Sequence, residues 1–110
     1  MGACTFQTYS HGKSADEAYR NAKEEANLYN GHREGYSGDI QTTSGYSGPV
    51  TIGRKNIDKY IVENEDRFQK YGNCGCIELL GTRMTKKKAQ LGQKGKRGVR
   101  IFCFFGWAAE

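Results

Sequence analysis

The first clear pattern along the chain is a set of apolar side chains at the spacing of one helix face. It follows Ser14, and Glu17 stands three residues later, which together make a capping-box sequence. The pattern predicts a helix over residues 14–30 that stops near Gly31. Its apolar face would consist of Ala15, Ala18, Tyr19, Ala22, Ala26 and Tyr29.

A second helical pattern begins after Asn56, a residue that favours the cap position of a helix. It predicts a helix over residues 56–71, with Gly72 as the residue at which the helix stops. The residues at helical spacing are Ile57, Tyr60, Ile61, Phe68 and Tyr71.

Three other stretches alternate or run apolar in the manner of strands. These patterns predict a first strand over residues 3–9, another over residues 74–85 and the last over residues 98–107. In the last stretch Phe102 and Phe104 share one face, while Ile101, Cys103 and Phe105 share the other. Because both faces are apolar, we expect this strand to be central and covered on both sides.

Between the two predicted helices lies a stretch rich in glycine and tyrosine, residues 31–53. The sequence Gly-Tyr-Ser-Gly occurs there twice, at residues 35–38 and 45–48, and a β-branched residue, Ile40 or Val50, follows two positions after each copy. Two short strands with glycine turns would explain the repeat. Chance similarity between two turns is the alternative, because Gly and Ser are common turn residues.

These elements predict an α+β domain over residues 1–110, with a mostly antiparallel sheet of four to five strands and two helices packed on one face. A chain of 110 residues makes one domain. Its 13 aromatic residues and single proline argue against a disordered chain. The N-terminus, which begins Met-Gly-Ala-Cys, lacks the charged start and apolar stretch of a secretory signal. No apolar run approaches the roughly 20 residues that a membrane helix needs. We therefore expect a cytoplasmic protein that has no membrane partner.

Charge changes this picture most, because eight of the 17 Lys and Arg residues fall between positions 83 and 100 without an intervening acid. The formal charge is +5, so removing these +8 leaves −3 on the other 92 residues. The basic residues are Arg83, Lys86, Lys87, Lys88, Lys94, Lys96, Arg97 and Arg100.

Such a local concentration of positive charge is typical of contact with a polyanion. We expect residues 83–100 to form a flexible loop or hairpin tip that binds nucleic acid or a nucleoprotein. The alternative is a solvated tip whose charge only aids solubility.

The glycine-tyrosine stretch offers another kind of binding site. Tyr36 and Tyr46 could stack on a base while Arg33, Arg54 and Lys55 contact phosphate. This arrangement would make the protein a nucleotide-binding protein that sequesters a nucleotide signal.

Catalysis and metal binding have little support in the sequence. The chain has two histidines, His11 and His32, at opposite ends of the first predicted helix, and no recognisable catalytic motif. Cys74 and Cys76 would share one face of a strand, but their spacing differs from the usual Cys-x-x-Cys pair. We expect a protein that is not an enzyme, needs no cofactor and holds its four cysteines reduced.

Four stretches taken together resemble small, largely uncharacterised accessory proteins encoded by bacteriophages. They are residues 1–4 (MGAC), 15–22 (ADEAYRNA), 35–40 (GYSGDI) and 104–108 (FFGWA). The resemblance implies a phage protein that acts inside a bacterium, where such proteins often block host defences, CRISPR-Cas nucleoproteins included. On this basis we expect an anti-CRISPR-like inhibitor, with a plain nucleic-acid-binding protein as a further alternative.

Overall fold

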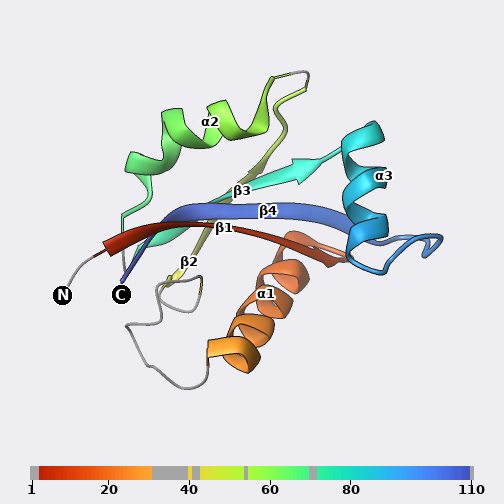
Figure 1. Ribbon diagram of the computed structural model, residues 1–110, viewed down its shortest axis with the longest axis horizontal. Helices are drawn as coiled ribbons and strands as arrows, with labels where there is room; N and C mark the ends of the chain where they lie inside the picture. The colour runs from red at the N-terminus through yellow and green to blue at the C-terminus, as the bar shows by residue number, and fades with distance from the viewer. Residues whose placement is uncertain (1–2, 31–39, 41–42, 54, 70–71, 110) are drawn as a thin grey trace.

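A computed structural model describes residues 3–30, 40, 43–53, 55–69 and 72–109 of the chain. These residues form a four-stranded sheet with helices packed on both of its faces (Figure 1). The elements are β1 (Ala3–Gly12), α1 (Ala15–Asn30), β2 (Gly45–Val50), α2 (Ile57–Asn64), the 3₁₀ helix η2 (Glu65–Arg67), β3 (Asn73–Leu79), α3 (Gly81–Gln90) and β4 (Arg100–Ala109).

The sheet has the strand order β1-β4-β3-β2, so the first and last strands of the chain are neighbours. β4 pairs antiparallel with β1 on one side and with β3 on the other, while β2 runs parallel to β3. The register places Gly12 opposite Arg100 and Leu79 opposite Ile101. One end of the sheet therefore gathers the end of β1, the end of β3 and the start of β4.

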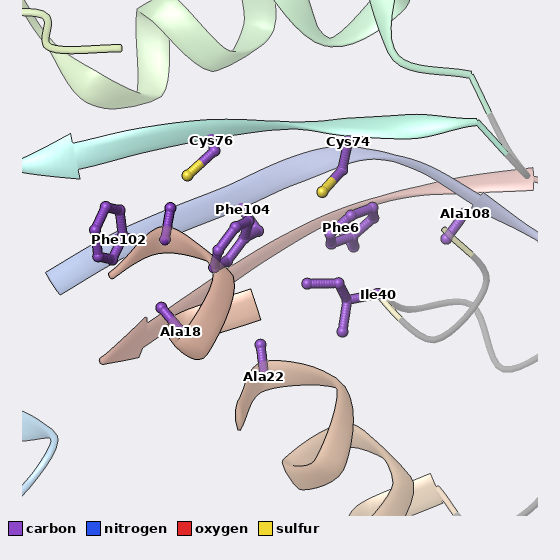
Figure 2. Packing of buried hydrophobic residues seen from close by; sticks show 10 residues of the cluster. Phe6, Ala18, Ala22, Ile40, Cys74, Cys76, Phe102, Phe104 and Ala108 are labelled. Atoms are coloured by element: carbon purple, nitrogen blue, oxygen red, sulfur yellow. The ribbon is translucent and has the colours of Figure 1, made fainter. Parts of the chain in front are cut away.

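One face of the sheet packs against α1 (Figure 2). Phe102 and Phe104 of β4 are fully buried there, and small side chains on the facing side of α1, Ala18 and Ala22, let the helix approach closely. Each buried phenylalanine contributes roughly 1.5–3 kcal/mol of hydrophobic stabilisation. The predicted cap of α1 is present, because the Glu17 amide donates to Ser14 Oγ at 3.2 Å.

The opposite face packs against α2, η2 and α3. Ile101, Cys103 and Phe105 of β4 are buried on this side, which confirms β4 as a central strand covered on both faces. The Tyr60 and Phe68 rings pack edge-to-face with the Phe105 ring, with ring centres 6.3 and 5.4 Å away.

The predicted helix over residues 56–71 is shorter in the structure. Its cap is as expected, because Asn56 Oδ1 accepts from the Lys59 amide at 3.0 Å. However, α2 ends at Asn64 and η2 at Arg67, so Gly72 is not the residue that stops the helix. The backbone leaves helical geometry at Phe68, where the carbonyl accepts from the Trp107 amide at 2.8 Å. Contact with β4 therefore overrides the helical spacing beyond residue 67.

The strand predicted over residues 74–85 also ends early. β3 stops at Leu79, and Gly81 turns the chain with a φ of +62° into helix α3. The residues that follow are mainly good helix formers, such as Lys, Met, Ala and Gln. The expected loop or hairpin over residues 83–100 is thus wrong for its first half, which is helical.

The α+β class is confirmed, and three details differ from the expected architecture. The sheet is mixed, the described residues form three α-helices, and these helices cover both faces rather than one. The second Gly-Tyr-Ser-Gly copy lies in β2, as expected for a short strand, whereas residues 35–38 lie outside the described residues. None of the described helices is long and apolar enough to cross a membrane.

Candidate nucleic-acid interface

Helix α3 and the following loop, residues 91–99, project from one end of the sheet (Figure 1). They contain seven of the eight clustered basic residues, and Arg100 at the start of β4 is the eighth. No acidic residue lies between Glu78 and Glu110 in the sequence. This end of the molecule is consequently its most basic described part.

Helix α3 has two distinct sides. Met84 and the following Leu91 pack against the core beneath β4, and the basic residues Arg83, Lys87 and Lys88 are half-buried on the same side. The other side carries only exposed residues at helical spacing. These are Thr82, Thr85, Lys86, Ala89 and Gln90.

The three half-buried cations of α3 have partners within the protein. Arg83 Nη2 donates to the Lys55 carbonyl at 2.8 Å, and the Lys87 ammonium lies 4.0 Å from the centre of the Tyr9 ring. Lys88 Nζ donates to the Lys96 carbonyl at 2.5 Å. These contacts attach α3 to the start of α2, to β1 and to its own loop, so the three cations hold the basic region in place.

Arg100 is also engaged, because it forms two hydrogen bonds with the Glu78 carboxylate at 2.8 and 2.6 Å. Hydrogen bonding to this carboxylate raises the pKa of Arg100 above its ordinary value. The guanidinium also lies 5.3 Å from the centre of the Phe102 ring. The Glu78 carboxylate therefore neutralises the charge of Arg100, and the pair links β3 to β4.

The loop between α3 and β4 consists of three successive turns. Gly92, Gly95 and Gly98 recur at every third position with φ values of +72°, +82° and +76°. Side chains other than glycine rarely adopt this left-handed conformation. A Cβ atom at any of the three would meet no atom within 4 Å, so the backbone conformation and not crowding requires glycine here. The backbone of these turns is open to an approaching ligand.

Four cations of the segment remain without a partner among the described residues. All four are exposed: one stands on the outer side of α3 and three in the loop. We refer to them as the exposed cations, and they are Lys86, Lys94, Lys96 and Arg97.

The structure adds one cation that the sequence pattern missed. Lys13 is exposed and directly follows Gly12, whose register partner is Arg100. It therefore lies at the same end of the sheet as the loop, although it is 70 residues before Arg83 in the sequence. Only the pairing of the first strand with the last reveals this, and no signal in the sequence specifies that pairing.

The alternative nucleotide site is not assembled by the residues that the structure describes. The Tyr46 hydroxyl donates to the Asp16 carboxylate of α1, which raises the Tyr46 pKa to about 12. Its ring packs against Tyr19 and Phe104, with ring centres 5.3 and 5.8 Å away. Tyr46 thus faces α1, whereas Lys55 lines a groove along α2 on the opposite face. Arg33, Tyr36 and Arg54 lie outside the described residues.

The cysteines have a structural place in the sheet. Cys74 and Cys76 share one face of the sheet, as their spacing predicts, and point towards α1 (Figure 2). Cys103 packs in the cluster on the opposite face. All three are buried free thiols, and burial raises the pKa of Cys74 and of Cys103 to about 12. No metal-binding group of three or more His, Cys, Asp or Glu side chains occurs among the described residues. These thiols are poor nucleophiles because they stay protonated.

No protein-family model, no curated protein and no solved structure matches the chain.

Proposed function

We propose that the protein binds the phosphate backbone of nucleic acid, free or within a nucleoprotein, through α3 and the loop 91–99. The observation that carries this proposal is the set of exposed cations, which have no partner among the described residues. Lys88 ties the loop to α3 through the Lys96 carbonyl, so these charges stand on one connected structure. Cations held beside each other without acids between them attract a polyanion.

The number of exposed cations sets the expected strength of the salt dependence. Each neutralised phosphate of duplex DNA adds about −0.9 to the slope of log affinity against log salt. Four contacts give a slope of about −3.6, which lowers affinity on the order of 10²-fold between 50 and 200 mM salt. A region whose charge serves only solubility gives no such binding.

Charge reversal in the loop tests the proposal. The double variant Lys94→Glu, Arg97→Glu changes two exposed cations whose side chains form no hydrogen bond or ion pair with other described residues. We expect it to fold normally and to lose binding to labelled oligonucleotides in fluorescence polarisation. The matched control is Arg20→Glu, Lys59→Glu, which changes the net charge equally at exposed positions of α1 and α2. Equal binding by both variants, or no binding by the unaltered protein at low salt, would refute the proposal.

The biological role that we propose rests on the resemblance to bacteriophage accessory proteins. In this role the protein is a non-catalytic inhibitor in the bacterial cytoplasm that blocks a defence nucleoprotein, such as a CRISPR-Cas complex, by occupying its nucleic-acid path. Expression in a bacterium with active CRISPR-Cas immunity should restore plaque formation by a targeted phage. The Lys94→Glu, Arg97→Glu variant should not restore it. Unrestored plaques across the CRISPR-Cas types tested would argue for a plain nucleic-acid-binding protein.

A further inference from the structure

The outer side of α3 carries short, uncharged polar or small side chains around one lysine. Thr82, Thr85, Lys86, Ala89 and Gln90 are all exposed, and no acid stands among them. Threonine, alanine, lysine and glutamine are residue types that contact base edges in the major groove of DNA. Short side chains also let a helix backbone approach the floor of a groove.

Helix α3 lies at one end of the sheet, where its outer side is accessible to a groove of nucleic acid. Few residues of α3 contact the sheet, and its inner side is anchored by Met84 together with the contacts of Arg83 and Lys87. The loop 91–99 continues from its C-terminal end at the same end of the molecule (Figure 1). A polyanion that reaches the outer side of α3 would therefore have the loop cations beside it.

Dimensions favour duplex DNA over duplex RNA. α3 has ten residues, which gives a helix about 15 Å long and about 10–12 Å in diameter with its side chains. The major groove of B-form DNA is about 12 Å wide and admits an α-helix. The major groove of A-form RNA is deep and narrow, so side chains cannot read it.

Single strands fit this surface less well, because α3 and its loop offer no aromatic ring on which a base could stack. Proteins that bind single strands without sequence preference stack bases on aromatic rings. Residues 81–101 contain no aromatic residue. Two aromatic rings beside the basic region are engaged, since Lys87 covers Tyr9 and Phe102 is fully buried beneath Arg100.

From these observations we infer that the nucleic acid is duplex DNA, with the outer side of α3 in the major groove and the loop cations on the flanking phosphates. The inference rests on the proposed function and narrows it to one class of substrate. Lys86 stands at the centre of the helix side that enters the groove, while Lys94, Lys96 and Arg97 contact the backbone.

A duplex whose major groove is filled tests the inference with the unaltered protein. Glucosylated 5-hydroxymethylcytosine places a sugar in the major groove and leaves the phosphates and the minor groove unchanged. We expect affinity for such a duplex to fall at least about tenfold relative to the unmodified duplex. Duplex RNA and both single strands of the same sequence should bind less tightly than the unmodified DNA duplex.

A paired substitution gives a second readout. Ala89→Tyr adds bulk to the outer side of α3, and Val62→Tyr adds it to the exposed side of α2, where the valine is 67% exposed. Both variants keep the net charge. We expect Ala89→Tyr to weaken binding to duplex DNA and Val62→Tyr to leave it unchanged, with similar thermal unfolding midpoints.

The outcomes separate this inference from the proposed function. Equal affinity for the glucosylated and plain duplexes, or tighter binding to RNA or single strands, overturns the inference and leaves backbone binding in place. Absence of binding to every nucleic acid at low salt overturns both.

Discussion

The Lys87 ammonium lies 4.0 Å from the centre of the Tyr9 ring, and this contact joins α3 to the edge strand β1. Contacts of this kind divide the basic residues into two groups, those with a partner among the described residues and those without one. Lys87, Lys88, Arg83 and Arg100 have partners within the protein and fix the shape of the basic region. The exposed cations have none among the described residues and are available to a ligand.

Removing the charge of Lys87 should therefore affect stability more than binding. Lys87→Met keeps the hydrocarbon stem and deletes the ammonium above Tyr9. A cation–π contact contributes about 0.5–1 kcal/mol at such partly exposed sites, so we expect that loss in the free energy of unfolding measured with urea. The salt slope of nucleic-acid binding should stay unchanged. A shallower slope with unchanged stability would place Lys87 among the phosphate contacts instead.

Releasing Arg100 from Glu78 should, in contrast, change the salt dependence of binding. Glu78→Gln removes the carboxylate that accepts two hydrogen bonds from Arg100, and only 15% of the Glu78 side chain is exposed. We expect a loss of about 1 kcal/mol in stability and a salt slope steeper by about 0.9, because one more cation can contact phosphate. Weaker binding by this variant would contradict the division into engaged and exposed cations.

The glycine turns of the loop should tolerate only residues that accept a positive φ. Gly95 has a φ of +82° with open space around its Cα. Gly95→Ala should lower stability by about 1–2 kcal/mol or distort the turn, and nucleic-acid affinity should fall with it. Gly95→Asn is the control, because asparagine adopts this conformation more readily, and it should retain most of the affinity.

Gly75 of β3 is required for a different reason. A Cβ atom there would lie 2.4 Å from Phe105 Cζ and 2.9 Å from Phe68 Cε2. Gly75→Ala must displace both rings, so we expect a loss of about 1–3 kcal/mol in the urea-derived free energy of unfolding. Because this position is far from α3, the affinity of the folded fraction should not change.

The buried thiols make stability dependent on alkaline pH. Burial raises the pKa of Cys74 and Cys103 to about 12 in the folded protein, against an ordinary value of about 8.5 in the unfolded chain. Between these values the unfolded chain binds fewer protons, so stability is complete below about pH 8.5 and falls as pH rises towards 12. Urea midpoints measured from pH 7 to 10 should decrease above pH 8.5. A urea midpoint that rises with pH would contradict burial of these thiols in the folded protein. In native protein at pH 8, no more than one of the four thiols should react with a disulfide reagent.

Local patterns in the sequence predicted the elements that local interactions determine. The Ser14 cap, the Asn56 cap and the two apolar faces of β4 are all present in the structure. The predicted boundaries are wrong where tertiary contacts override the local helical pattern. At Phe68, for example, the hydrogen bond from the Trp107 amide ends helical geometry. The sequence did contain a signal for α3 that the strand assignment overlooked. Met84 and Leu91 stand seven residues apart among good helix formers, the spacing of one helix face.

The basic segment itself could be found from the sequence, but its internal division could not. Eight cations in one window look equivalent until the structure pairs Arg100 with Glu78 and places Lys87 over Tyr9, at separations of 22 and 78 residues. Lys13 joins the same end of the sheet only through the pairing of β1 with β4. Long-range strand pairing of this kind is not encoded in any local pattern.

The most direct measurement is a nuclear magnetic resonance titration of ¹⁵N-labelled protein with a short DNA duplex at low salt. The proposed site predicts that amide shifts concentrate in α3 and the loop 91–99, with Lys13 also affected and α1 and α2 unchanged. Shifts centred on α1 or α2, or no shifts at all, would contradict a nucleic-acid interface formed by α3 and its loop.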